Sequence, residues 1–201
     1  MPRSAETAQP EYAATIRRKL LYMRLFVGIP LAPDVVNRLS VAVARLSAPE
    51  DGLRWTLPAT WHITLQFLGE ASPAQCQELV ENLSEIKSAP FSVHVGDVGC
   101  FDRAGVIYAG IYPSSELSAL ERKVVAATAL VGFQAEQKTY RPHITLARAK
   151  GRQGLPAARC LGKSVHGLDF GSFKVQEFLL LESFLETAGA RYEARHAFRL
   201  G

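Results

Sequence analysis

The fold is decided by a short repeat, WHITLQFLGE at residues 61–70 and PHITLARA at residues 142–149. The four letters HITL are identical in the two copies and lie 81 positions apart (143 minus 62) in a chain of 201 residues. A repeat of this kind indicates two related halves, each of which contributes one strand to a shared site.

Within each copy, polar and apolar residues alternate. Alternate side chains of a β-strand share a face, so His62 and Thr64 point to one face of the first strand. Ile63, Leu65 and Phe67 point to the opposite face. In the second copy, His143 and Thr145 share one face, and Ile144 and Leu146 share the opposite face. We expect the apolar faces to anchor two strands in the core and the polar faces to surround one space.

These residue types suit chemistry on a phosphodiester. One imidazole takes a proton from the attacking oxygen, another gives a proton to the leaving oxygen, and histidine titrates near neutrality. Threonine hydroxyls can donate to the non-bridging oxygens. Neither copy has Asp or Glu within three residues of its histidine, whereas a two-metal site needs several carboxylates. We therefore expect no metal and no cofactor, and we expect the other histidines (His94, His166, His196) to be structural or surface residues.

The composition is that of an ordinary globular protein, with 48% hydrophobic and 21% charged residues. The net charge of +4 suits a polyanionic partner without requiring one. Three cysteines without a CxxC pair argue against a disulfide framework or a zinc ribbon and favour reduced thiols in the cytoplasm. The apolar run at residues 20–31 is interrupted by Arg24 and too short for a membrane span, so we interpret residues 23–29 as a first core strand.

Elsewhere, strands alternate with helices. Period-two patterns predict strands at residues 62–68, 91–98, 106–112, 143–147, 173–181 and 190–200, the last two joined by a turn at Ala188-Gly189. Apolar stripes predict helices at 34–46, after a cap at Ser72, and after Pro113. Residues 150–171 are predicted to be mostly loop, with a short helix near 157–161. Neighbouring hairpins favour antiparallel sheets in an α+β fold.

Together these residues resemble the RNA 2′,3′-cyclic phosphodiesterases of the two-histidine phosphoesterase superfamily, also described as 2′-5′ RNA ligases. The similarity runs from Met23 to about Leu200 and rests on MRLFV (23–27), LRW (53–55), WHITLQFLGE (61–70), RPHITLAR (141–148) and LES (181–183). It implies one domain at residues 23–201, made of two pseudo-symmetric lobes around a central cleft, each a mainly antiparallel sheet with outer helices. Residues 1–22 are expected to be a poorly ordered N-terminal extension.

The resemblance also implies roles. His62 would be the proton donor and His143 the proton acceptor in opening a terminal 2′,3′-cyclic phosphate to a 2′-phosphate. Thr64, Thr145 and Arg148 would bind phosphate, and Phe67 would line the site. Strict alternation places Arg148 and Phe67 on the wrong face, so Arg148 reaches the cleft only if the strand ends or bulges near Ala147. The expected partner is an RNA end such as a tRNA fragment, with no membrane and a monomeric protein.

Other interpretations stay open at this point. The same pair of histidines could act on 2′-5′ linkages or small cyclic nucleotides, or run in reverse as a ligase. A non-catalytic RNA-binding module is a further alternative, which the presence of both histidines and both threonines disfavours. Arg54 and Trp55 could stack a base or bind phosphate, or be a tryptophan packed at a lobe edge beside a solvated arginine. Three basic residues flank the second copy and could attract RNA or be solvated: Arg141, Lys150 and Arg152.

Overall fold

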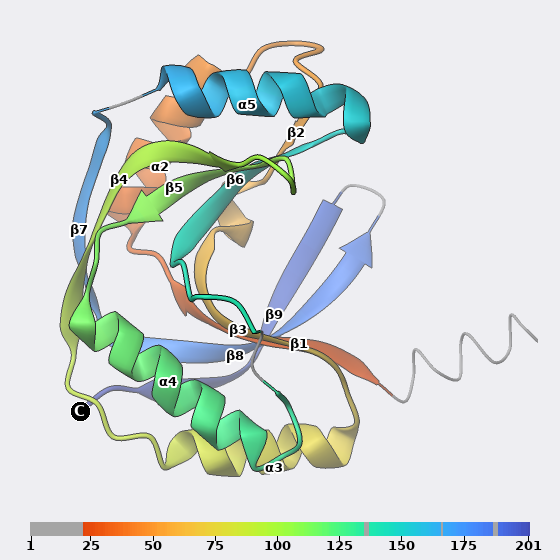
Figure 1. Ribbon diagram of the computed structural model, residues 1–201. Coiled ribbons are helices and arrows are strands. Elements are labelled where there is room, and N and C mark those ends of the chain that lie inside the picture. Colours follow the sequence, from red (N-terminus) through yellow and green to blue (C-terminus); the bar gives the residue numbers. More distant parts are fainter. Residues whose placement is uncertain (1–21, 135–136, 166, 187–188) are drawn as a thin grey trace, which may run out of the picture.

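Two antiparallel sheets organise the chain in the computed structural model, which describes residues 22–134, 137–165, 167–186 and 189–201. The first sheet has the order β3-β1-β8-β9, built from β1 Met23–Pro30, β3 His62–Ala71, β8 Glu177–Glu186 and β9 Gly189–Arg199. The second has the order β2-β6-β5-β4-β7, built from β2 Leu53–Trp55, β4 Phe91–Phe101, β5 Val106–Ile111, β6 His143–Ala149 and β7 Asp169–Val175 (Figure 1). Apart from Tyr22, the predicted N-terminal extension lies outside the described residues.

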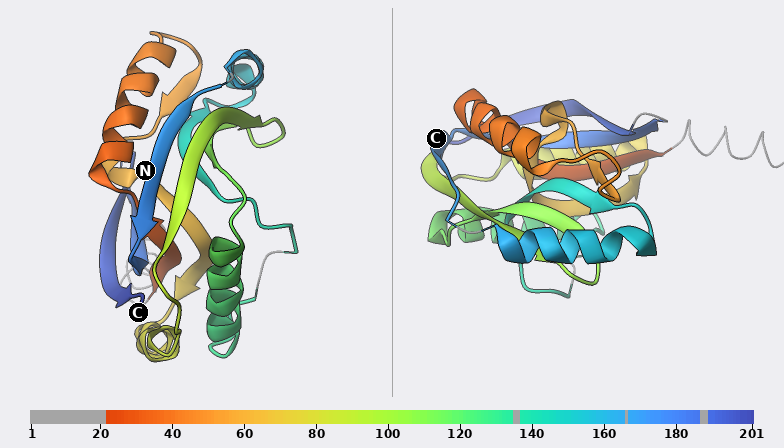
Figure 2. Two further views of the ribbon diagram at one scale, coloured as in Figure 1. Left: turned by 90° about the vertical axis from the view of Figure 1, so that its left-hand side faces the viewer. Right: turned by 90° about the horizontal axis from the view of Figure 1, so that it is seen from above.

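Helices flank both sheets. They are α2 Pro33–Leu46, α3 Pro73–Ser84, α4 Ser115–Ala129 and α5 Leu155–Ser164, with short 3₁₀ turns η1 Pro58–Thr60 and η2 Arg152–Gly154. α3 begins at the predicted cap, a capping box between Ser72 and Gln75. α3 packs on α4 and α4 on β3, whereas α5 packs on β4, β5 and β6 and α2 lies alongside β7 (Figure 2). The predicted α+β architecture of two antiparallel lobes with flanking helices is confirmed.

The two lobes are not the two halves of the sequence. The two motif strands enter different sheets, as the repeat predicts, but the first sheet is completed by β8 and β9 from the end of the chain. α2 and β2 lie between β1 and β3 in sequence. β2 nevertheless joins the second sheet and α2 packs on β7 of that sheet, so both belong to the lobe built on the second sheet. Figure 1 shows β7 running along one side of the molecule toward β8, where the chain returns to the first sheet.

One sequence-based assignment is wrong and another is correct only in part. Residues 173–181 are not one strand, because the chain leaves the second sheet after Val175 and enters the first at Glu177. Two consecutive polar residues, Gln176 and Glu177, interrupt the alternation here, but only packing against two different sheets makes this interruption a change of sheet. The short helix expected near residues 157–161 is present as α5, but α5 has ten residues and β7 begins at Asp169, so residues 150–171 are not mostly loop. The three-residue β2 was not predicted either, since pairing with β6 defines it rather than periodicity.

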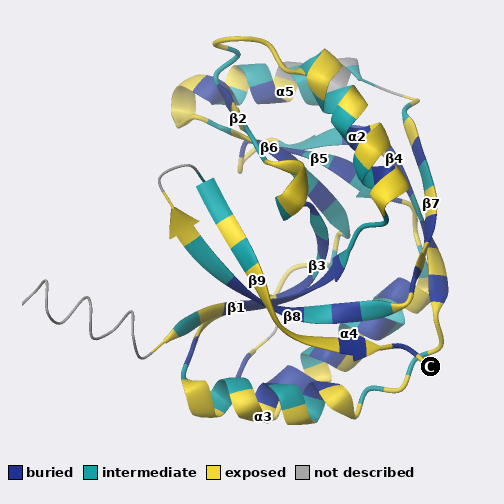
Figure 3. Ribbon diagram, turned by 180° about the vertical axis from the view of Figure 1, so that it is seen from behind, coloured by how far each residue is buried: buried dark blue, intermediate teal, exposed yellow. Residues whose placement is uncertain are grey.

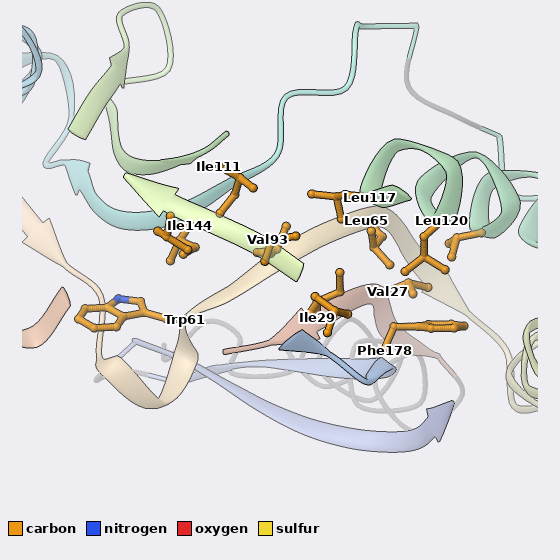
Figure 4. Close-up of a cluster of buried hydrophobic side chains, with 14 of the residues drawn as sticks. Val27, Ile29, Trp61, Leu65, Val93, Ile111, Leu117, Leu120, Ile144 and Phe178 are labelled. Atoms are coloured by element: carbon orange, nitrogen blue, oxygen red, sulfur yellow. The ribbon is translucent and has the colours of Figure 1, made fainter. Parts of the chain in front are cut away.

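One hydrophobic core extends under both sheets. Figure 4 shows Leu65 of β3 and Ile144 of β6 in the same buried cluster as side chains from α4. The apolar positions of both motif copies are buried as predicted, with exposed fractions of 0–4%: Ile63, Leu65, Ile144 and Leu146. Figure 3 shows the buried centre of the sheets and the more exposed far end of the β8–β9 hairpin. Within the described residues, no helix is both long enough and apolar enough to cross a membrane.

Candidate active site

Each motif strand contains a β-bulge at the same position of the repeat. In β3 the pairing with β1 passes from Gly28–Thr64 to Val27–Gln66, so Leu65 is the extra residue. Leu65 and Gln66 are consecutively buried, and Phe67 returns to the face of His62. A bulge shifts the alternation of all later residues by one. The strict alternation that placed Phe67 on the core face was therefore wrong.

The second strand has the equivalent bulge. Pairing of β6 with β5 passes from Tyr108–Thr145 to Ile107–Ala147, which leaves Leu146 as the extra residue. Leu146 and Ala147 are both buried and Arg148 is exposed on the face of His143. The bulge near Ala147 that would let Arg148 reach the cleft is present.

Both imidazoles are held in the same way. His62 Nδ1 lies 2.8 Å from the Thr60 carbonyl oxygen, and His143 Nδ1 lies 2.7 Å from the Arg141 carbonyl oxygen. A carbonyl oxygen only accepts, so Nδ1 carries the hydrogen in each ring. Nε2 of each ring is left to take up or release a proton, which is the property that acid–base catalysis requires.

Each imidazole is also flanked by two aromatic rings of its own sheet. Phe26 and Tyr192 lie with ring centroids 4.8 and 5.2 Å from His62. Phe101 and Tyr108 lie 4.9 and 5.6 Å from His143. These rings were not identified from the sequence, because they come from other strands of the two sheets: β1, β9, β4 and β5.

These surroundings favour the neutral imidazole. Burial lowers the pKa of His62 below its usual 6.5, the Thr60 carbonyl opposes this, and the positive charges of His143 and Arg148 lower it further. Burial likewise lowers the pKa of His143, with the Arg141 carbonyl opposing and the charge of Arg148 adding to the effect. Arg148 therefore lies within electrostatic reach of both histidines.

A cleft of about 780 Å³ brings the predicted residues together. Five of the six line it: Thr64, Phe67, His143, Thr145 and Arg148. His62 is not part of the lining but lies on the same strand and face as Thr64. Among the described lining residues Glu121 is the one carboxylate, against Lys138, Arg141 and Arg148. The described residues contain no group of three His, Cys, Asp or Glu side chains that could hold a metal ion.

Reciprocal hydrogen bonds join the two motifs across the lobes. Tyr140, just before the second motif, donates from its hydroxyl to the Thr64 carbonyl at 3.0 Å. Thr56, just before the first motif, donates to the carbonyls of Thr145 and Leu146, both at 2.9 Å, and accepts from Trp61 Nε1. Burial raises the pKa of Tyr140, with the charge of Glu121 adding to it, so the phenol stays a donor. Sequence reasoning missed both residues because no local pattern reports a contact between lobes.

Of the other residues singled out from the sequence, some line the cleft and others lie away from it. Arg141 lines the cleft, whereas Lys150 and Arg152 are exposed residues outside the lining. Trp55 is half-buried, packs against the core and donates from Nε1 to Asp51, in keeping with the alternative of a tryptophan at a lobe edge. His94 bonds Ser172 and Asp169, and His196 packs on Phe198. His166 lies outside the described residues.

Comparisons with known proteins place this architecture in a family. Residues 29–108 match the family of LigT-like phosphoesterases. The chain is 31% identical to the RNA 2′,3′-cyclic phosphodiesterase of Aquifex aeolicus over 89% of this chain and 98% of the relative. It is also 31% identical to that of Aeropyrum pernix, over 78% and 89% of the two chains. The crystal structure of E. coli LigT complexed with 3′-AMP matches with a TM-score of 0.76 and 27% identity, over 89% and 98%. The chain therefore belongs to the family of RNA 2′,3′-cyclic phosphodiesterases, which are LigT-like phosphoesterases.

Proposed function

We propose that this protein hydrolyses the terminal 2′,3′-cyclic phosphate of an RNA to a 2′-phosphate by a metal-free, two-histidine mechanism. The observation that supports this best is that His62 and His143 have the same tautomer, fixed by the same kind of hydrogen bond. Each Nδ1 is bound to a backbone carbonyl, so each Nε2 is the reactive nitrogen. Two imidazoles with this arrangement can serve as one acid and one base without a metal ion.

The proposed reaction is a single in-line displacement. The His143 Nε2 takes a proton from a water molecule whose oxygen attacks phosphorus. The bond from phosphorus to the 3′-oxygen breaks, and His62 Nε2 gives its proton to that oxygen. The products are a 2′-phosphate and a 3′-hydroxyl, and proton exchange with water restores both histidines.

Three side chains stabilise the phosphate in this proposal. The hydroxyls of Thr64 and Thr145 have no hydrogen-bond partner within the described part of the chain and lie on the face of their histidines. Arg148 supplies a guanidinium, which binds phosphate oxygens in a bidentate manner. A bound anionic phosphate raises the pKa values of the histidines, which the protein lowers. It therefore favours the state in which one imidazole is protonated, as the reaction requires.

Phosphorus NMR of the product tests the proposal. An RNA with a 2′,3′-cyclic end should yield a 2′-phosphate, and the rate should be unchanged by EDTA. A 3′-phosphate would show that donor and acceptor roles are reversed, and loss of activity with EDTA that a divalent ion restores would contradict the metal-free mechanism. Joining of RNA ends instead of hydrolysis would favour the ligase alternative, and binding without turnover would favour an RNA-binding module.

A further inference from the structure

Arg54 lies beside Arg148 on the second sheet. β2 pairs antiparallel with β6, and the register places Arg54 directly opposite Arg148. Opposite residues in such a pair project to the same face, about 5 Å apart. Arg148 lines the cleft, and the register puts Arg54 on the same face of the sheet, just outside the residues that line the cleft. The alternation in β2 agrees, since Leu53 is buried and Trp55 packs against the core.

In the part of the chain that the structure describes, no carboxylate pairs with either guanidinium. Like charges directly opposite one another in a sheet are destabilising, and within the described residues neither arginine forms an ion pair. Asp51, three residues before Arg54, is already engaged, because its carboxylate accepts from Trp55 Nε1 and from the backbone N–H groups of Ala48 and Leu53. The two exposed positive charges thus form a site suited to an anion.

We propose that Arg54 binds the phosphodiester next to the terminal cyclic phosphate of an RNA substrate. The inference rests on the proposed function, and it adds a binding residue for the phosphodiester that precedes the terminal cyclic phosphate. Arg148 lines the cleft on the same face of β6 as His143, so in this proposal it binds the reacting phosphate. Arg54 lies one strand further out, on β2 at the edge of the sheet. A substrate with a second phosphate engages both arginines, and a cyclic mononucleotide engages Arg148 alone.

The test compares three substrates with a 2′,3′-cyclic end: uridine, the dinucleotide UpU, and UpU with an uncharged methylphosphonate linkage. For the wild type, removing the internal charge should lower kcat/KM about fivefold to tenfold, as expected for one charge-assisted contact. Arg54→Gln should lower kcat/KM on charged UpU by a similar factor and on the mononucleotide much less. In Arg54→Gln, replacing the charged linkage by the uncharged one should lower kcat/KM little further, because both changes remove the same interaction.

Arg45→Gln is the matched control, since Arg45 is an exposed arginine in the last turn of α2. It should leave all three rates unchanged. The proposal is overturned if Arg54→Gln lowers the rates on charged and uncharged UpU equally, or if Arg45→Gln gives the same pattern as Arg54→Gln.

A binding measurement keeps the inference separate from the proposed function. Fluorescence anisotropy of a labelled RNA with a 2′-phosphate end gives affinity as a function of salt concentration. Loss of one phosphate contact should reduce the slope of log K against log salt by about 0.7 in Arg54→Gln and not in Arg45→Gln. An unchanged slope refutes the role of Arg54 even if hydrolysis occurs, whereas a reduced slope without hydrolysis supports the role and refutes the proposed reaction.

Discussion

The two motif strands, β3 and β6, are alike in backbone and different in what they present to the cleft. Both contain a bulge at the leucine of HITL, both bind Nδ1 of their histidine to the carbonyl two residues before it, and both place the histidine between two aromatic rings. Five positions after the histidine they diverge, with Phe67 in β3 and Arg148 in β6. Phe67 keeps 58% of its surface exposed and lines the cleft.

This difference shows how a symmetric scaffold can hold an asymmetric substrate. The shared features prepare two equivalent nitrogens, and symmetry alone cannot make one an acid and the other a base. A guanidinium on one side and an aromatic ring on the other attract phosphate and base differently. The orientation of the substrate, and with it the identity of the product, therefore depends on the residues that break the repeat.

The largest expected effect is loss of either histidine. His62→Ala and His143→Ala should each lower kcat about 10²–10⁴-fold, because each removes a proton-transfer group. A substrate with a nitrophenol leaving group needs no general acid, so it should recover much of the loss in His62→Ala and little in His143→Ala. His94→Ala, which changes a histidine bound to Ser172 and Asp169, is the control and should be near wild type. Equal recovery in both variants would contradict the proposed roles.

The pH dependence of kcat/KM tests the two histidines as a pair. One must be protonated and the other neutral, so the profile should be bell-shaped and fall up to tenfold per pH unit on each side. Burial and the charge of Arg148 lower both pKa values, so the optimum should lie on the acid side of the usual histidine value of 6.5. Arg148→Gln removes a positive charge that disfavours the imidazolium, so it should shift the profile to higher pH. A monotonic profile would mean that only one histidine titrates in the reaction.

Single substitutions of Arg148 and Phe67 test the difference between the two motif strands. Arg148→Gln should lower kcat/KM roughly tenfold through loss of a charge-assisted bond to phosphate. Phe67→Leu removes an aromatic platform and should act mainly on KM, by a few-fold. Steady-state kinetics on RNA ends with different terminal bases separate the two. If Phe67→Leu lowers kcat as much as Arg148→Gln does, the ring has a role beyond binding.

The smallest effects concern the hydrogen bonds of Thr56 and Tyr140 to the motif strands. Thr56→Val removes bonds to two carbonyls and to Trp61, and should lower the free energy of unfolding by about 1–3 kcal/mol. Tyr140→Phe removes one bond to Thr64 and should cost about 1 kcal/mol. Both should lower kcat a few-fold by loosening the spacing of the motifs. Denaturant unfolding measures the stability change, and Ser84→Ala, which removes only a local bond within α3, should change neither quantity.

Much of the site was determined by the sequence alone. The alternation of HITL predicted two strands with buried Ile and Leu and with His and Thr on the opposite face, and the structure confirms this burial. The cap of α3 at Ser72 followed from local backbone chemistry. The proton-transfer capacity of His62 and His143 follows from the residue type itself. These features depend on residues a few positions apart, which is the range over which strand and helix periodicity operate.

The rest was decided by the tertiary structure. A bulge is defined by one strand relative to its neighbour, so no pattern within β3 or β6 could place Phe67 and Arg148 in the cleft. The change of sheet at Gln176, the bonds of Thr56 and Tyr140 to the motif strands, and the pairing of Arg54 with Arg148 likewise depend on contacts between residues distant in sequence. Periodicity specifies which face a side chain takes within one strand. Only packing specifies which strand lies beside it, and that choice assembled the site.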